Sequence, residues 1–349
     1  GASLQQLLRQ AADGDTIEIL AGDHRGQVAV IEHRRLTLRG VGGRPVLHAD
    51  GRSAEGKAIL VVRDGDIRIE NLEFRGARVR DRNGAGIRFE RGRLTVARCA
   101  FVDNENGILT ANFGDAELTV QDSEFAQAPA NTPLPHLLYV GRIARFALSG
   151  SRFSGGRQGH LVKSRARVSD VRYNALIDGP GGRAAYELEF PNGGLAWVIG
   201  NLIGQSADTS NPVVLSFGSE GSDEREHGLF MAHNTVVSAG LRPAWFVRVA
   251  PLPRPVERRL VNNLYVGLGA TDVAWDDVAQ GNVLVPLPVL RDAARGDFGL
   301  APETWLRGRA VEPGQARGLS LRPEAEFAAP VGTRSLAPPA RWAPGALQE

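Results

Sequence analysis

Residues 94–101, with the sequence LTVARCAF, decide the fold because near-copies of this segment recur along the chain. Each copy is a short run of alternating apolar residues, typical of a strand, that closes with a phenylalanine. The strong copies are IRIENLEF at 67–74, LTVQDSEF at 118–125 and FALSGSRF at 146–153. Weaker copies are centred on Asn174, Asn201, Asn234, Asn263 and Asn282, and successive landmarks lie 19 to 33 residues apart. This self-similarity predicts a repeat architecture.

A second short strand accompanies each copy, such as GIRF from Gly86 and GILT from Gly107. Two or three strands per repeat, separated by Gly, Asn and Asp turns, are typical of one coil of a β-solenoid. The Leu-x-x-Leu-x-Leu frame of leucine-rich repeats is absent, and propeller blades need longer repeats. We therefore expect an all-β chain with two parts. Residues 1–290 would form the solenoid and residues 291–349 a proline-rich, irregular tail packed on it.

Over roughly residues 15–290 the chain resembles the right-handed parallel β-helix proteins of the pectate-lyase-like superfamily. The opening segment from Leu4 to the turn at residues 13–15 resembles that superfamily's N-terminal capping helix and its entry into the first coil. The repeated asparagines resemble its internal Asn ladder. The resemblance implies a right-handed parallel β-helix, but the superfamily includes lyases, hydrolases, epimerases and phage adhesins, so it leaves the activity open.

The overall composition narrows the choice of partners. The chain has 349 residues and a formal net charge of +2, which gives no bulk field for nucleic acid. Cys99 is the single cysteine, and no apolar run reaches the length of a membrane span. We expect no nucleic-acid partner, no membrane insertion and a monomer. The resemblance implies a secreted or periplasmic protein whose signal peptide is not in this sequence.

A local duplication predicts which side chains share a face. The segments HLLY at 136–139, HLVK at 160–163 and AAYE at 184–187 follow one another at 24-residue intervals. Stacked in that register, they place Tyr139, Lys163 and Glu187 in one outward column. The next column would hold Arg165, Glu189 and Ser216, with Arg248 above them. The residues expected at the border of this face are His136, His160, Arg142 and Asn192, and the polar segment 219–227 would overhang it as a lid or a solvated loop.

The resemblance to uronate-polysaccharide lyases implies a role for each of these groups. Lys163 is one of only two lysines among 41 basic residues, and an amine can act as a base near neutral pH where a guanidinium cannot. Arg165 or Arg142 would bind the substrate carboxylate, and Tyr139 or His160 would donate a proton. The remaining candidates for substrate binding are His136, Glu187, Glu189, Ser216 and Arg248. Two cross-strand ion pairs, Lys163 with Glu187 and Arg165 with Glu189, would explain the same pattern without catalysis.

Three alternatives concern the carboxylates. The pair Glu187 and Glu189 resembles the calcium-binding pair of the chondroitinase-B and alginate-lyase type, which implies a Ca²⁺ site with Asn192 as a third ligand. In this sequence the lysine comes one coil before the pair, where that family has it directly after. The same two glutamates could instead serve a glycoside hydrolase as acid and base. A non-catalytic carbohydrate-binding or adhesin solenoid is the third reading, for which only Tyr139 and Phe246 are expected as outward aromatic residues. The leading prediction is a lyase that cleaves an acidic polysaccharide by β-elimination.

Overall fold

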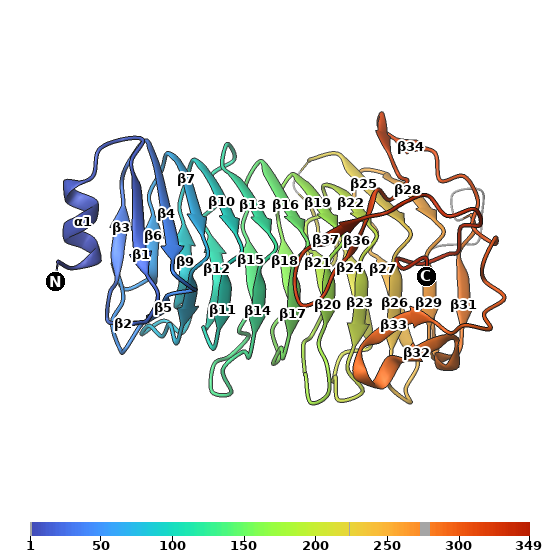
Figure 1. Cartoon of the computed structure of the whole chain (residues 1–349). Helices are drawn as coiled ribbons and strands as arrows, with labels where there is room; N and C mark the ends of the chain where they lie inside the picture. Colours follow the sequence, from blue (N-terminus) through green and yellow to red (C-terminus); the bar gives the residue numbers. More distant parts are fainter. Residues whose placement is uncertain (1, 223, 273–279) are drawn as a thin grey trace.

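The computed structural model describes residues 2–222, 224–272 and 280–349, and it forms a right-handed parallel β-helix (Figure 1). Each coil contributes one strand to each of three parallel sheets of 10, 11 and 10 strands. Sheet A contains β1 (Thr16–Leu20), β4 (Arg35–Val41), β7 (Asp66–Glu70), β10 (Arg93–Ala97), β13 (Glu117–Gln121), β16 (Arg145–Ser149), β19 (Val168–Arg172), β22 (Leu195–Ile199), β25 (His227–Ala232) and β28 (Val256–Val261). The prediction of a β-solenoid is confirmed.

The other two sheets follow sheet A around each coil. Sheet B contains β2 (Asp23–Arg25), β5 (Val46–His48), β8 (Glu73–Arg75), β11 (Ala100–Val102), β14 (Glu124–Ala126), β17 (Arg152–Ser154), β20 (Ala175–Ile177), β23 (Leu202–Gln205), β26 (Thr235–Ser238), β29 (Leu264–Val266) and β31 (Val283–Val285). Sheet C contains β3 (Ala29–Ile31), β6 (Ala58–Val62), β9 (Ala85–Phe89), β12 (Asn106–Thr110), β15 (Leu138–Val140), β18 (Val162–Ser164), β21 (Leu188–Phe190), β24 (Val213–Phe217), β27 (Ala244–Val249) and β30 (Gly269–Thr271).

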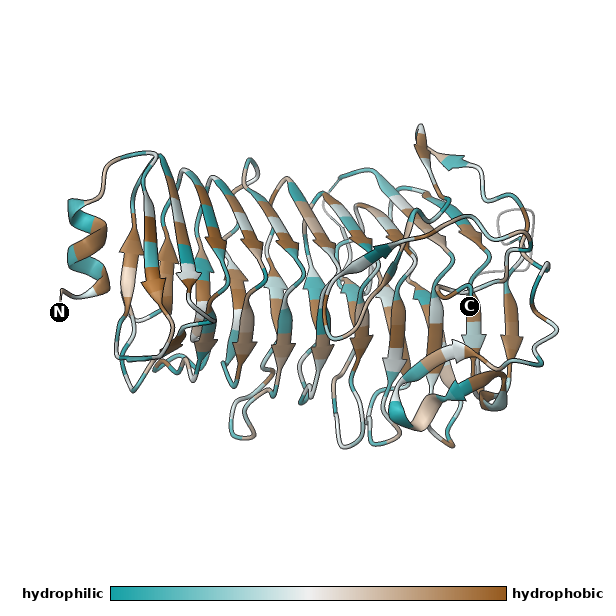
Figure 2. Ribbon diagram, in the orientation of Figure 1, coloured by the Kyte–Doolittle hydropathy of each residue, from teal (hydrophilic) through white to brown (hydrophobic). Residues whose placement is uncertain are grey.

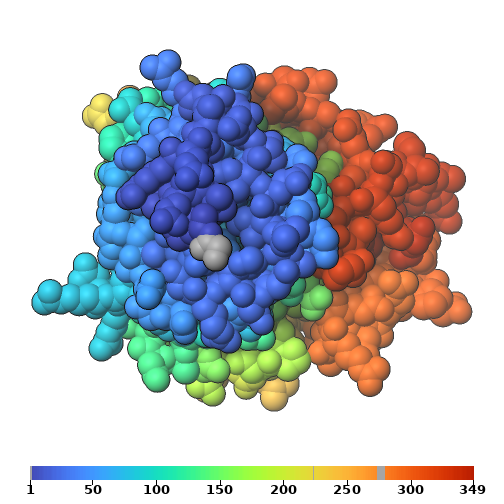
Figure 3. Space-filling model, turned by 60° about the vertical axis from the view of Figure 1, so that its left-hand side comes forward, coloured from blue at the N-terminus to red at the C-terminus, as the bar shows by residue number. Residues whose placement is uncertain are grey.

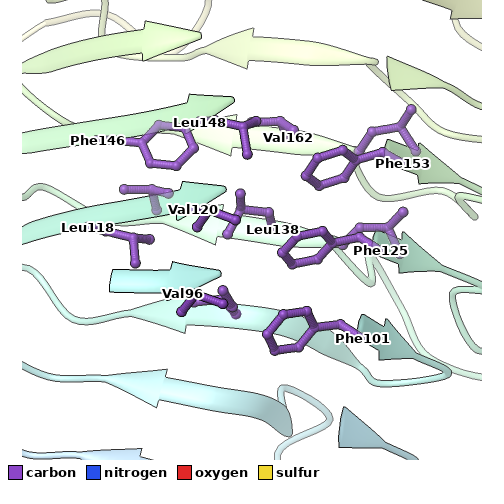
Figure 4. Close-up of a cluster of buried hydrophobic side chains, with 14 of the residues drawn as sticks. Val96, Phe101, Leu118, Val120, Phe125, Leu138, Phe146, Leu148, Phe153 and Val162 are labelled. Atoms are coloured by element: carbon purple, nitrogen blue, oxygen red, sulfur yellow. The ribbon is translucent and has the colours of Figure 1, made fainter. Parts of the chain in front are cut away.

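Apolar side chains of all three sheets fill the interior, and apolar residues recur along the strands of every coil (Figure 2). The phenylalanines that close the repeats stack on one another (Figure 4). The ring centroids of Phe74 and Phe101 lie 5.2 Å apart, those of Phe101 and Phe125 4.6 Å, and those of Phe125 and Phe153 4.5 Å. These separations match the distance of about 4.8 Å between neighbouring strands, so the repeated phenylalanine acts as an interior register mark.

The predicted Asn ladder is present in the second half of the solenoid. The Asn174 side-chain amide donates to the Asn201 oxygen at 3.0 Å, and Asn201 donates to Asn234 at 3.0 Å. The same bond continues from Asn234 to Asn263 and from Asn263 to Asn282. Each amide also donates to a strand carbonyl, as Asn201 does to Val171 at 2.8 Å. The ladder satisfies polar groups at the turn between sheets A and B that would otherwise be buried without a partner.

The first coil is covered by helix α1 (Leu4–Gln10), as predicted. Ser3 is its N-cap and forms a capping box with Gln6, in which each side chain accepts a backbone amide of the other. Leu4 and Leu8 are buried against the solenoid interior. The helix therefore closes one end of the apolar core.

The C-terminal tail runs back along the outside of the solenoid (Figures 1 and 3). It contains the short helices η1 (Leu287–Val289) and η2 (Ala293–Arg295) and three antiparallel strand pairs: β32 (Leu290–Asp292) with β33 (Asp297–Leu300), β34 (Gln315–Ala316) with β35 (Leu319–Ser320), and β36 (Ala325–Phe327) with β37 (Thr333–Ser335). Phe298, Leu300 and Ala346 pack on the outer side of sheet B. Leu321 packs against Trp197 and Phe230 on the outer side of sheet A.

Candidate active site

The outer face of sheet C carries a row of polar residues, one from each of five successive strands. Strand pairing aligns Tyr139 with Lys163, Lys163 with Glu189, Glu189 with Ser216, and Ser216 with Arg248. We call these five residues the outer row. In the coils that contain β21 and β24, the outward residues of sheets A and B, such as Trp197, Phe230 and Leu202, are largely apolar and lie under the tail. In these two coils, among the described residues, the polar side chains that face outward in a row are those of sheet C.

The predicted register is wrong by two residues at β21. Glu189, not Glu187, pairs with Lys163, and Arg165 lies beyond the strand in the turn that follows it. The step from His136 to His160 is 24 residues, but the next equivalent residue is Tyr186, a step of 26. The His160 ring lies between the two in a tilted arrangement, with its centroid 4.6 Å from that of His136 and 4.8 Å from that of Tyr186. Turn length varies between coils while strand pairing does not, so a constant spacing misplaced the following coil.

Glu187 lies outside the candidate site, contrary to the prediction. Its backbone amide donates to the carbonyl of Val214, so it belongs to the row of apolar residues at the turn between sheets B and C. Its side chain is 0% exposed, and among the described residues neither carboxyl oxygen has a hydrogen-bond partner. Burial raises the pKa of Glu187 well above its ordinary value, and the carboxylate of Asp178 raises it further. Burial therefore favours the neutral form of this side chain. Because Glu187 is in the interior and Glu189 is on the outer face, the geometry gives no support to a hydrolase that uses them as its pair.

Two cations of the site share one carboxylate. Lys163 Nζ lies 3.0 Å from Glu220 Oε1, and Arg165 Nη2 lies 2.6 Å from Glu220 Oε2. Lys163 is buried, whereas the Glu220 side chain is 44% exposed. Burial raises the pKa of Glu220, but its contacts with Arg165 and Lys163 outweigh burial and hold the pKa below its ordinary value. The two cations therefore form a binding position for an ionised carboxylate.

Arg165 is oriented by a phenol and an amide. Its Nε donates to Tyr139 Oη at 2.9 Å, and its Nη1 donates to Asn192 Oδ1 at 2.7 Å. The Asn192 amide in turn donates to the carbonyl of Gly221 at 3.1 Å. With Glu220 on Nη2, the guanidinium is held in one plane by partners from three coils. Such a fixed fork is suited to bidentate recognition of a carboxylate.

Glu189 contacts both the buried His160 and Ser219 of the segment that overhangs the face. Its Oε2 lies 2.5 Å from His160 Nε2 and 3.9 Å from Lys163 Nζ, and its Oε1 accepts the Ser219 hydroxyl at 2.6 Å. Burial raises the pKa of Glu189, but His160, Ser219 and Lys163 together bring it below its ordinary value. Burial also lowers the pKa of His160, and Glu189 offsets this only in part. An ionised Glu189 therefore lies beside a histidine that burial drives toward its neutral form.

His136 supports this arrangement from the neighbouring coil. Its Nδ1 accepts the backbone amide of His160 at 2.9 Å, and its ring lies 5.1 Å from that of Tyr139. Burial lowers the pKa of His136 well below its ordinary value, and His160 and Lys163 lower it further. A neutral His136 therefore positions His160 and Tyr139.

The other predicted residues lie at varying distances from this centre. Ser216 is next to Glu189 in the outer row but buried, and Arg248 follows it, half exposed and 3.6 Å from Asp272. Arg142 has an exposed side chain in the turn after β15, and its backbone amide donates to Asn112. Phe246, expected to point outward, is buried in the core against Tyr265. The outward aromatic residue of β27 is Trp245.

The residues proposed for Ca²⁺ do not fit a metal site. Glu187 is buried elsewhere, both oxygens of Glu189 have close contacts with other side chains, and Asn192 Oδ1 accepts from Arg165. A calcium site needs several oxygen ligands facing one point, and here the oxygens face cations and donors. Within the described parts of the chain, no three His, Cys, Asp or Glu side chains are grouped as metal ligands.

Sequence reasoning did not single out Glu220 and Ser219, although the segment 219–227 was expected to overhang this face. Both residues contact the site, since Ser219 bonds to Glu189 and Glu220 bonds to Lys163 and Arg165. The available signal was the 33-residue interval between Asn201 and Asn234, the longest between landmarks. An insertion of this kind beside a rigid sheet often carries functional residues.

Comparison with known proteins supports the fold and leaves the chemistry open. No family model matches the sequence, and no curated protein matches it. Among solved structures, the chain is similar to the crystal structure of pectate lyase Pel9A, with a TM-score of 0.59 and 12% sequence identity. The alignment covers 90% of this chain and 87% of that one. The fold is therefore that of the pectate-lyase-like β-helices. In the described residues, no helix is long and apolar enough to cross a membrane.

Proposed function

We propose that the protein is a polysaccharide lyase that cleaves a uronate-containing polysaccharide by β-elimination on the outer face of sheet C. In this proposal it acts outside the cytoplasm, in keeping with its fold. The observation that carries the proposal is the shared position of Lys163 and Arg165 on one carboxylate, that of Glu220. A uronate presents the same group to the same two cations.

The carboxylate position explains how the reaction would begin. A proton on the carbon next to a carboxylate becomes acidic when the carboxylate is neutralised, because the developing charge is delocalised onto its oxygens. Arg165 supplies that neutralisation with a guanidinium held by Tyr139 and Asn192. When the substrate carboxylate displaces Glu220, it occupies the position between Arg165 and Lys163 and brings C5 of the sugar beside Lys163 Nζ.

The remaining steps follow from the positions of the side chains. Lys163 first gives its own proton to solvent, and its neutral Nζ then removes the proton from C5. The electron pair left behind forms the C4–C5 double bond as the C4–O bond breaks. Tyr139 donates its phenolic proton to the leaving oxygen, and its Oη, already bonded to Arg165, carries the resulting charge. The products are a 4,5-unsaturated uronate and a shorter chain with a free hydroxyl. Lys163 then loses its proton to solvent, and Tyr139 regains one.

Ultraviolet absorbance of unsaturated ends tests the proposal directly. The full-length protein is incubated with polygalacturonate, alginate and glycosaminoglycan polymers, alongside Lys163→Arg and Tyr139→Phe variants. We expect absorbance with at least one polymer and a loss on the order of 100-fold or more in kcat for each variant. Lys57→Arg, which changes the other lysine and lies outside the site, is the matched control. Reducing ends without unsaturation would select a hydrolase, binding without products an adhesin, and full activity of Lys163→Arg would exclude this base.

A further inference from the structure

Trp245 and Arg248 form a second candidate contact surface on the outer face of sheet C. Both lie on β27, three strands beyond Lys163 in the order β18, β21, β24, β27. The Arg248 guanidinium carbon lies 5.7 Å from the centroid of the Trp245 indole. The side chain of Arg248 is 57% exposed and Trp245 is 36% exposed. An aromatic plane and a cation thus face solvent side by side.

Core packing does not account for the exposed indole. The neighbouring residues Ala244, Phe246 and Val247 belong to the solenoid core, whereas Trp245 belongs to none of the buried apolar clusters of the described residues. Trp197 shows the contrast, because its ring is buried against Phe230 and under the tail. An exposed aromatic ring beside a cation offers the stacking surface and the ion pair that a charged sugar needs.

The outer row places this pair in line with the candidate active site. Arg248 pairs with Ser216, Ser216 with Glu189, and Glu189 with Lys163. Three strand intervals of about 4.8 Å separate Arg248 from Lys163 by roughly 14 Å along the solenoid axis. A single sugar ring cannot span that distance, but an oligosaccharide laid along the row can.

We propose that Trp245 and Arg248 form a distal subsite that binds a second uronate ring of the polysaccharide whose scissile bond lies at Lys163 and Arg165. This subsite rests on the proposed function. The apolar face of the sugar ring stacks on the indole, and the uronate carboxylate pairs with Arg248. Asp272 lies 3.6 Å from the Arg248 guanidinium, which is longer than a charge-assisted hydrogen bond and leaves donors of Arg248 available. The consequence is a preference for longer chains.

Binding of oligogalacturonates of two lengths tests the subsite. Trimer and hexamer affinities are measured by calorimetry on the full chain in a Lys163→Ala background, so that the oligomers are not cleaved. We expect Trp245→Ala and Arg248→Gln each to weaken hexamer binding roughly three- to tenfold and to leave trimer binding unchanged. Trp245→Phe, which keeps an aromatic ring, retains most of the hexamer affinity.

A matched control is present in the tail. Trp305 is 57% exposed and has Arg309 5.6 Å from its ring centroid, so it has the same chemistry away from sheet C. Trp305→Ala leaves both affinities unchanged. Equal losses for trimer and hexamer, or unchanged hexamer binding, would overturn the subsite while the proposed lyase stands. If no uronate oligomer binds the Lys163→Ala protein and wild type yields no unsaturated product, both proposals fail.

Discussion

Glu220 Oε2 lies 2.6 Å from Arg165 Nη2, and this ion pair places a carboxylate of the protein where a substrate carboxylate is proposed to bind. The other oxygen of Glu220 reaches Lys163 at 3.0 Å. Substrate and Glu220 therefore compete for the same two cations. The cost of displacing Glu220 is modest because its side chain is 44% exposed and water screens the pair.

Glu220→Gln is expected to lower KM for a uronate polymer roughly two- to fivefold, since the substrate no longer displaces an ionised carboxylate. Steady-state kinetics of unsaturated-end formation measure the change. Glu226→Gln is the control, because Glu226 lies in the same segment but pairs with Arg317 of the tail. A large fall in kcat for Glu220→Gln would show instead that Glu220 takes part in the chemistry.

Glu187 and Glu189 are two residues apart, yet we expect opposite results from their replacement. Glu187→Leu puts an apolar side chain in an apolar row and is expected to leave the free energy of unfolding unchanged or raise it by up to about 2 kcal/mol, with activity retained. Glu189→Leu leaves His160, Ser219 and Lys163 without their shared partner, so it is expected to lower that free energy by about 3 kcal/mol and to abolish activity. Chemical denaturation and the absorbance assay measure both effects. Lost activity in a folded Glu187→Leu protein would contradict the placement of Glu187 outside the active site.

The buried carboxyl group of Asp178 should make the free energy of unfolding depend on pH. Burial raises its pKa from 3.8 to about 6, although the backbone amides of Ala184 and Gly156 donate to its oxygens. The folded state therefore holds this proton more tightly than the unfolded state, and stability from Asp178 is lost as the pH rises from about 4 to about 6, by about 3 kcal/mol at most. Asp178→Asn is expected to flatten this part of the profile in denaturant titrations at fixed pH values. An unchanged slope in the variant would show that another group is responsible.

Asn201 is an interior member of the ladder, and its replacement leaves several buried polar groups without a hydrogen-bond partner. Its amide bonds to Asn174, Asn234 and the Val171 carbonyl, all in a fully buried environment. Asn201→Ala is expected to lower the free energy of unfolding by about 2–4 kcal/mol. Asn282→Ala, at the half-buried end of the ladder, is expected to cost less, because it has one Asn neighbour instead of two. The losses are measured by thermal and denaturant unfolding. If Asn201→Ala and Asn282→Ala lowered the free energy of unfolding equally, this would argue against a contribution from the ladder.

The sequence was sufficient for the fold because its signals are repeated. Phe74, Phe101, Phe125 and Phe153 mark one position of successive coils, and Asn174 to Asn282 mark another, so an error at one copy is corrected by the others. The strand pairs of the tail were not predicted. They occur once each, in a proline-rich segment with no repeat to reveal them.

The candidate site was only partly predictable. Tyr139 and Lys163 pair as expected because the 24-residue spacing holds between their coils. The next coil is two residues longer, so Glu187 leaves the face and Glu189, which was predicted beside Arg165, pairs with Lys163 instead. Glu220 could not be placed from spacing, since it comes from an inserted segment whose path depends on tertiary contacts. Strand register is thus predictable only as far as the turns keep their length.

The packing of the tail on sheets A and B has a consequence for biosynthesis. The outward apolar residues Ala175 and Leu202 are covered by Phe298, Leu300 and Ala346, which are translated much later. At about 5–20 residues per second, Ala175 precedes Ala346 by roughly ten to thirty seconds. During that interval the apolar outer surface of the nascent solenoid is exposed to solvent and prone to aggregation. The risk of aggregation therefore depends on how quickly the last part of the polypeptide is made.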